Sequence, residues 1–153
     1  MHKPDETDRR LLRQLQAEAT LTASELAVRC SLSPAQVARR IERMEREGII
    51  KGFRAEIDWR ALGFAVEVSL RVTLDKTQAS AFDEFLAAAR EIAEVDEIQT
   101  FLGRVDVRLN VLARDMAHYQ QLYRSRILTL PHIADIEALM TVANVKHGKA
   151  LPL

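Results

Sequence analysis

The sequence predicts an α+β protein with a helical N-terminal unit followed by a βαββαβ domain. Over the first 46 residues, apolar side chains recur at helical spacing in segments that begin with capping residues. From Val66 to Leu74 they alternate at every second position, as in a strand with one buried and one wetter face. Helical and strand patterns then follow each other to the end of the chain.

The first two predicted helices are short and closely spaced. Leucines at helical spacing predict a helix over residues 8–19. Thr22 is the expected N-cap of the second helix, because Glu25 three residues later completes a capping box. Its expected buried residues are Leu26, Ala27 and Cys30.

The segment 32–48, LSPAQVARRIERMEREG, predicts a third helix with well-marked ends. Ser33 is a strong N-cap residue, Gln36 completes its capping box, and Gly48 suits the position just beyond the C-terminus. The predicted buried stripe consists of Val37, Ile41 and Met44. Since only a short turn separates this helix from the second one, the arrangement is a helix-turn-helix.

The exposed face of the third helix is cationic, which is typical of a DNA recognition helix. The candidate DNA-binding residues are Ser33, Ala35, Gln36, Arg39, Arg40 and Arg43. Gln36 and Arg39 are expected to point towards base edges, whereas Ser33 and Arg43 are expected to meet the phosphate backbone. The alternative is a solvated helix whose arginines pair with Glu42, Glu45 and Glu47.

A connecting segment links the helices to the second domain. Residues 49–57 alternate loosely around a central glycine and predict a short strand or wing. The stretch 58–63, DWRALG, is the expected junction, at which Trp59 packs. We therefore place a DNA-binding domain at residues 1–60 and a second domain at residues 61–153.

The second domain has the element order of a ferredoxin-like split unit. A first strand from Phe64 is followed by a helix over residues 78–90. Two strands, 95–102 and 105–112, are expected to form a hairpin joined at Gly103-Arg104. Asp115 opens another helix, and residues 133–145 form a last strand.

Composition excludes several classes of protein. With 48% hydrophobic and 29% charged residues, the chain has the composition of a globular domain. It contains no apolar run near the roughly 20 residues of a membrane span, and its charged N-terminus does not resemble a signal peptide. A single cysteine is consistent with a reducing cytoplasm. Scattered histidines and the lack of a glycine-rich phosphate loop predict no cofactor, metal or catalytic residue.

The charge balance bears on how DNA would be bound. The formal net charge is zero, yet residues 29–46 contain five arginines and two glutamates. Positive charge is thus focused on one segment, so DNA affinity would require local contacts and more than one copy of the site.

The chain resembles the Lrp/AsnC family, the leucine-responsive or feast–famine transcription regulators of bacteria and archaea. The resemblance lies in DRRLLRQLQ, LTASELAVRCSLSPAQVARRIERMEREGIIKGF, ALG, GRVDVRLNV and DMAHYQQLY. It implies a winged helix-turn-helix that binds double-stranded DNA, and a ligand-sensing domain that forms homodimers and often octamers. It also implies an amino acid or related metabolite as effector, bound between dimers.

In this family the effector loop lies between the two middle strands. The matching residues are Leu102, Gly103, Arg104, Val105 and Asp106. Gly103 and Asp106 agree with the family pattern, whereas an arginine at position 104 replaces an acidic residue. Because a guanidinium prefers carboxylates, the resemblance is compatible with a more acidic effector or with none. The alternative is that Gly103 permits a hairpin and Asp106 pairs locally.

The resulting hypothesis is a cytoplasmic transcription regulator whose oligomer binds promoter DNA under the control of a small metabolite. One alternative is an architectural DNA-binding protein without an effector. Another is a small enzyme on a ferredoxin-like domain, with a cavity lined by Arg71, Arg104 or Arg108.

Overall fold

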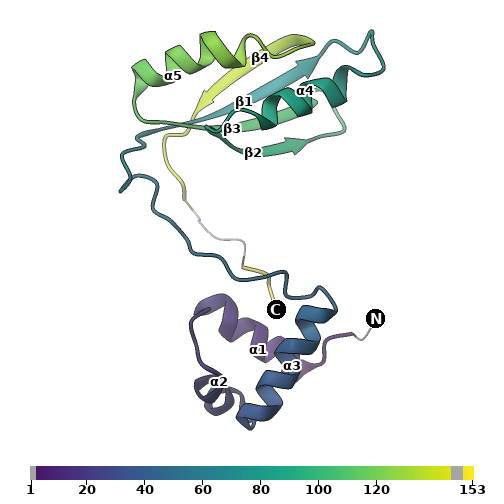
Figure 1. Ribbon diagram of the computed structural model, residues 1–153, viewed down its shortest axis with the longest axis vertical. Coiled ribbons are helices and arrows are strands. Elements are labelled where there is room, and N and C mark those ends of the chain that lie inside the picture. Colours follow the sequence, from purple (N-terminus) through teal and green to yellow (C-terminus); the bar gives the residue numbers. More distant parts are fainter. Residues whose placement is uncertain (1–2, 146–149) are drawn as a thin grey trace. The chain divides into compact units, whose positions relative to one another are not determined.

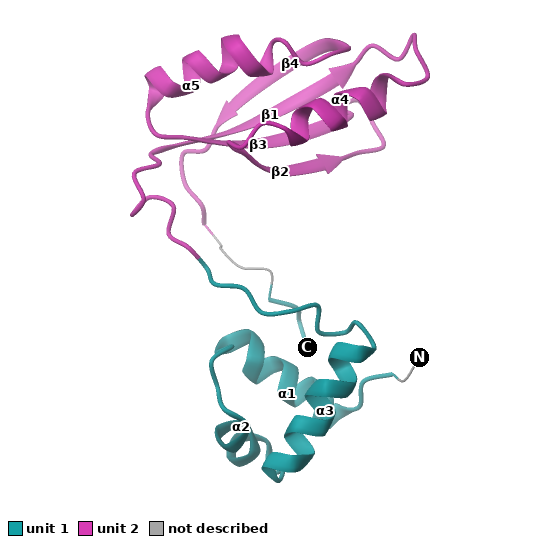
Figure 2. Cartoon of the chain, in the orientation of Figure 1, with its two compact units in different colours: residues 1–56, 147–153 teal, residues 57–146 magenta. Residues whose placement is uncertain are grey.

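The computed structural model describes residues 3–145 and 150–153. The chain forms two compact units, residues 1–56 with 147–153 and residues 57–146 (Figure 2). The C-terminal residues join the first unit, where the Leu151 N–H donates to Gln16 Oε1 at 2.6 Å. Each unit has a hydrophobic core of its own.

The first unit consists of three helices, α1 (Glu6–Ala17), α2 (Ala23–Cys30) and α3 (Pro34–Arg46) (Figure 1). The predicted capping boxes of α2 and α3 are confirmed. Helix α1 starts earlier than predicted because Asp5 and Asp8 form a capping box as well. Buried side chains from all three helices form the core: Leu11, Leu15, Leu21, Leu26, Ala27, Cys30, Val37 and Met44.

The ends of α2 and α3 fix the helix-turn-helix. Ser31 caps α2 in the left-handed conformation, and the Leu32 N–H donates to Ala27 O at 2.9 Å. Gly48 follows α3 with a φ of +71°. The Ile49 N–H donates to Met44 O at 2.8 Å and the Gly48 N–H to Glu45 O at 2.9 Å. These two bonds form a Schellman motif. Gly48 therefore occupies the predicted position just beyond the C-terminus of α3.

The strand predicted over residues 49–57 is absent. Residues 51–58 are exposed and have no regular secondary structure. Gly52 has a φ of +139°, which interrupts an extended backbone. The described part of the first unit contains no other strand with which this segment could pair, so alternating hydrophobicity alone did not produce a strand here.

The second unit has the predicted βαββαβ order. Its elements are β1 (Val66–Leu74), α4 (Ala81–Arg90), β2 (Val95–Thr100), β3 (Val107–Ala113), α5 (Met116–Leu122), which continues as the π-helical turn η1 (Tyr123–Ile127), and β4 (Ile133–Met140). The strands form one antiparallel sheet in the order β2-β3-β1-β4 (Figure 1). The hairpin loop is longer than predicted, since residues 101–106 lie outside both strands, and β4 ends earlier.

One face of this sheet is covered by helices. The alternating apolar residues of β1 and β3 pack against Phe85 and Ala89 of α4 and against Tyr119 and Leu122 of α5. The opposite face carries the polar residues of the same strands, among them Arg71 and Arg108. Among the described residues, no helix is long and apolar enough to cross a membrane.

Candidate functional site

Helix α3 presents part of the predicted DNA-binding set to solvent. Ser33, Ala35, Gln36 and Arg39 are all exposed. The Gln36 N–H donates to Ser33 Oγ at 3.2 Å, and the Ser33 N–H donates to Gln36 Oε1 at 2.9 Å. This capping box fixes the N-terminal turn of α3, the part of a recognition helix that usually approaches base edges.

Arg40 and Arg43, also in the predicted set, contact α1. Arg40 Nη1 donates to Asp8 Oδ1 at 2.7 Å and to Asp5 Oδ2 at 2.9 Å, and Arg43 Nη2 donates to Asp8 Oδ2 at 2.6 Å. Asp8 is completely buried, with an exposed fraction of 0%. These arginines therefore link α3 to α1, and among the described residues they form ion pairs with Asp5 and Asp8 but not with the glutamates that the alternative named.

The same cluster shifts the pKa values of Asp5 and Arg40. The Asp8 backbone N–H, followed by the Arg40 guanidinium, lowers the pKa of Asp5 to about 2. Hydrogen bonds from Arg40 to Asp5 and Asp8 raise the pKa of Arg40. Both shifts favour the charged forms, so the cluster is an ion-pair network near neutral pH.

In the predicted effector loop, Asp106 is engaged within the fold. Its Oδ2 accepts the Leu74 N–H at 2.9 Å, and its Oδ1 lies 2.6 Å from Lys76 Nζ. Burial raises the pKa of Asp106, but the bonds from Lys76 and Leu74 outweigh that effect and lower it overall. The carboxylate thus ties the start of β3 to the end of β1, as the alternative of local pairing expects.

The remaining loop residues lie at the surface. Leu102, Gly103 and Arg104 are exposed, and Val105 is half-buried. Gly103 does not have a positive φ, and a Cβ at this position would meet nothing within 4 Å. The backbone conformation at position 103 therefore does not require glycine. The alternative that Gly103 is needed to permit the hairpin turn loses its conformational basis.

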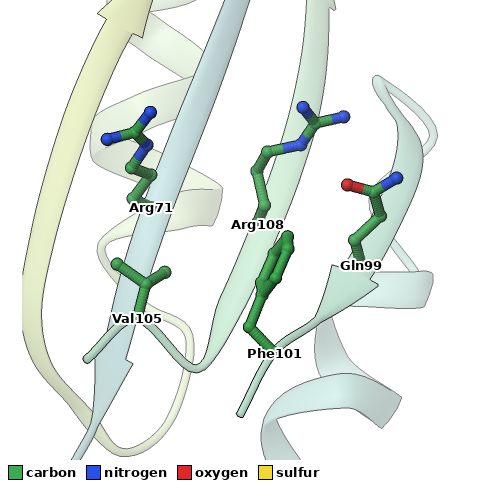
Figure 3. A pocket seen from close by; sticks show the side chains of 5 residues that line it. All are labelled: Arg71, Gln99, Phe101, Val105 and Arg108. Carbon is green, nitrogen blue, oxygen red and sulfur yellow. The ribbon is translucent and has the colours of Figure 1, made fainter. Parts of the chain in front are cut away.

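Beside this loop lies a hollow of about 400 Å³ on the open face of the sheet. It is lined by Arg71, Gln99, Phe101, Val105 and Arg108 (Figure 3). Val105 is the one member of the predicted effector loop that lines it. Sequence reasoning missed Gln99 and Phe101, and it considered the two lining arginines only for an enzyme. The alternation along β1 and β3 was the available signal, because it places Arg71 and Arg108 on one face.

No group of three or more histidine, cysteine, aspartate or glutamate residues that could hold a metal occurs within residues 3–145 and 150–153. His118 Nε2 lies 3.7 Å from Glu94 Oε1, and His132 Nε2 lies 2.7 Å from Glu84 Oε2. His2 and His147 are outside the described residues.

Both units match known families. Residues 67–151 match the Lrp/AsnC ligand binding domain, and residues 4–51 match a winged helix-turn-helix DNA-binding domain. The chain is 39% identical to the proline dehydrogenase transcriptional activator of Rhodobacter capsulatus, over 85% of this chain and 84% of that protein. It is 30% identical to the leucine-responsive regulatory protein of Salmonella typhimurium, over 96% and 90% respectively.

Solved structures of transcriptional regulators are similar to this chain over nearly its whole length. A transcriptional regulator from Neisseria meningitidis in complex with L-methionine superposes with a TM-score of 0.92 at 27% identity, covering 98% of this chain and 97% of that one. An AsnC family transcriptional regulator from Agrobacterium tumefaciens superposes with a TM-score of 0.89 at 30% identity, covering 97% of both chains.

Proposed function

The chain belongs to the Lrp/AsnC family of transcription regulators, and from this premise we propose that its α3 binds promoter DNA under the control of a small-molecule effector. Transcription regulation, DNA binding and a ligand-binding domain are properties of this family. We further propose that residues 1–60 bind DNA and residues 61–153 bind the effector and assemble the oligomer.

The proposal for the DNA interface divides the cationic residues of α3 into two groups. Arg40 and Arg43 are already engaged by Asp8. Arg39 is exposed on the same helix, one turn beyond the fixed N-terminal segment. We therefore assign base-edge contact to Gln36 and Arg39, phosphate contact to Ser33 and the helix N-terminus, and a flanking position to Ala35. The observation that carries this assignment is the pairing of Arg40 and Arg43 with α1.

The test is DNA binding by variants of the full chain, measured by fluorescence anisotropy on a duplex selected from random sequence. Arg39→Ala should weaken binding by about 10- to 100-fold and relax sequence preference at one base pair. Arg13→Ala is the matched control, because Arg13 is a half-buried α1 arginine that pairs with Glu6. Equal affinity of Arg39→Ala and the control would contradict the assignment.

For the second unit we propose effector binding and self-association. The L-methionine in the related Neisseria meningitidis regulator supports a small metabolite as the effector of this chain. We place this effector at the loop 102–106 and in the adjoining hollow.

A protein with zero net charge gains DNA affinity by presenting several recognition helices at once, so we propose a homodimer that assembles further, up to an octamer. We infer a cytoplasmic location and action by binding, without catalysis.

The effector assignment is tested by a thermal-shift screen of amino acids, 2-oxo acids and other acidic metabolites. A ligand that binds the folded state should raise the melting temperature, and the rise should grow with the logarithm of the ligand concentration once that concentration exceeds Kd. A flat response to every compound would instead favour an architectural DNA-binding protein.

A further inference from the structure

Backbone hydrogen bonds fix the position of Asp106 at the end of the predicted effector loop. Its N–H donates to Val72 O at 3.0 Å, and its carbonyl oxygen accepts the Phe101 N–H at 2.9 Å. Its carboxylate oxygen Oδ2 accepts the Leu74 N–H, also at 2.9 Å. These partners are main-chain groups of β1 and of the residue that follows β2. The fold therefore holds the carboxylate in place, with an exposed fraction of only 4% for the residue.

A flexible side chain completes the surroundings of this carboxylate. Lys76 Nζ lies 2.6 Å from Asp106 Oδ1, and the Lys76 side chain is 60% exposed, against 6% for that of Asp106. Lys76 lies in the turn after β1, and among the described residues its ammonium group has no other hydrogen-bond or ion-pair partner. A lysine ammonium is a strongly hydrated charge on a flexible stem. It can leave Asp106 for solvent without any change in the backbone.

The exchange of Lys76 must supply another positive charge to Asp106. Burial raises the pKa of Asp106, and the bonds from Lys76 and Leu74 outweigh that effect. A largely buried carboxylate that loses its charged partner is strongly destabilised. A ligand with an ammonium group replaces Lys76 charge for charge, whereas a neutral or anionic ligand leaves the carboxylate uncompensated. The Asp106 position thus selects for an ammonium group.

The same loop offers a group for the opposite charge of such a ligand. Arg104 is exposed two positions before Asp106, and in the described part of the chain its guanidinium has no hydrogen-bond or ion-pair partner. Thr73 Oγ1 donates to Arg104 O at 3.1 Å, which anchors this part of the loop beside the end of β1. Guanidinium groups bind carboxylates through charge-assisted hydrogen bonds. The loop therefore provides partners for both charged groups of an α-amino acid.

We propose that the Lys76 ammonium occupies the place of an effector's α-ammonium group on Asp106, and that an amino acid binds by displacing it. Asp106 Oδ1 then accepts from the ligand ammonium, the Leu74 N–H keeps Oδ2, and Arg104 holds the ligand carboxylate. Lys76 is thereby a specificity-determining residue, because only a ligand that brings its own ammonium group can replace it. The apparent affinity falls by the fraction of molecules in which Lys76 leaves the carboxylate uncovered. This inference rests on the proposed function, since it concerns the regulation of the effector site at residues 102–106.

The test is isothermal titration calorimetry of the full chain and of Lys76→Met with matched probes. The probes are L-leucine, L-methionine and L-phenylalanine, each compared with the 2-oxo acid of the same side chain. At least one amino acid should bind Lys76→Met about tenfold more tightly than wild type, as expected if Lys76 covers Asp106 in about nine of ten molecules. The 2-oxo acids have no ammonium group and should gain nothing. The proposal is overturned if no amino acid binds Lys76→Met more tightly than wild type, or if the 2-oxo acids gain equally.

Two control variants separate competition at Asp106 from a general effect of charge. Lys76→Arg keeps a cation beside Asp106 and should not show the gain in affinity of Lys76→Met. Lys51→Met removes an exposed lysine that has no hydrogen-bond or ion-pair partner among the described residues, and it should bind amino acids as wild type does. A gain in either control equal to that in Lys76→Met would overturn the proposal. Arg104→Gln should weaken the binding of both members of each probe pair, because both carry the carboxylate.

Chemical labelling of wild type tests the displacement directly, even if Lys76→Met does not fold. N-hydroxysuccinimide acetate acetylates neutral lysine amines, and an ion pair with a carboxylate keeps a lysine protonated and unreactive. A saturating amino acid should raise the acetylation rate of Lys76 by up to about tenfold, in step with the fraction released. The rate at Lys51, measured on the same sample by peptide mass spectrometry, should not change. A rate at Lys76 that stays constant or falls when an amino acid binds would overturn the proposal.

DNA binding of the same preparations separates this inference from the proposed function. If DNA binds but no amino acid displaces Lys76, the chain is a DNA-binding regulator and the inference is wrong. If DNA does not bind, the proposed function fails, while calorimetry and labelling still decide whether Lys76 competes with an amino acid for Asp106.

Discussion

At the scale of single residues, Asp8 links the first helix to the recognition helix. It is buried and accepts hydrogen bonds from both Arg40 and Arg43. The sequence indicated that these arginines are cationic and on α3, but not that they reach a carboxylate 32 and 35 positions earlier in the chain. That contact depends on how α1 packs against α3, which single-helix periodicity does not specify.

Replacing Asp8 by asparagine should destabilise the helical unit, because two partly buried arginines lose their counter-charge. The expected loss is about 2–3 kcal/mol, towards the lower end for a broken buried pair since both arginines remain partly exposed. Hydrogen exchange measured by mass spectrometry should show faster exchange in α1 and α3, with β1 and β3 unaffected. Glu42→Gln, at an exposed α3 position, should exchange as the wild type does. Wild-type protection in Asp8→Asn would contradict the structural role.

Asp5 should contribute a pH-dependent part of the stability of this unit. The pKa of Asp5 in the fold is about 2, below its ordinary value of 3.8. A lowered pKa stabilises the folded state above the unfolded value, and that contribution is lost as the pH falls from about 4 to about 2. The urea midpoint of the helical circular dichroism signal should therefore fall more steeply over this range in wild type than in Asp5→Asn. Asp135→Asn, exposed on β4, should follow wild type.

At the scale of elements, the sequence predicted helix ends better than strand ends. The caps of α2 and α3 depend on residues three positions apart, so local sequence is sufficient to identify them. Strands depend on partners far away in the chain, and the segment 49–57 has none. For the same reason β4 ends at Met140, although the apolar pattern continues to residue 145. Met140 opposite Val68 is the last registered pair of β4 with β1, and one further bond joins the Thr141 N–H to Glu67 O at 3.0 Å.

Gly48→Ala should destabilise α3 through its backbone alone. Gly48 has a φ of +71°, and a Cβ at this position would meet nothing within 4 Å. The cost is therefore the conformational penalty of a left-handed alanine, about 1 kcal/mol. Gly103→Ala is the matched comparison, since its Cβ would also meet nothing but its φ is not positive. Urea unfolding should show a loss in the first variant and no loss in the second; equal effects would contradict the role assigned to φ.

At the scale of the whole molecule, the sequence predicted both domain types, but it did not predict which side chains of the second unit line one hollow. Family resemblance placed the effector at residues 102–106, because that loop has recognisable residues at fixed positions. The hollow combines Val105 with Arg71, Gln99 and Arg108 from three strands. Which outward-facing side chains share a cavity depends on strand order and register, and neither was specified by periodicity.

Symmetric assembly should make DNA binding depend on the spacing of half-sites. A neutral chain with its cationic residues concentrated near α3 binds tightly only if two recognition helices engage the same face of the duplex. Successive major grooves on one face are about 34 Å apart, or roughly 10 base pairs. In a selected duplex with two half-sites, inserting five base pairs between them turns one half-site to the opposite face and should weaken binding by about tenfold or more. Inserting ten base pairs restores the face and should recover much of the affinity, so this duplex is the matched control. Equal affinity for the duplexes with five and ten inserted base pairs would mean that the recognition helices act independently, and symmetric pairing would be wrong.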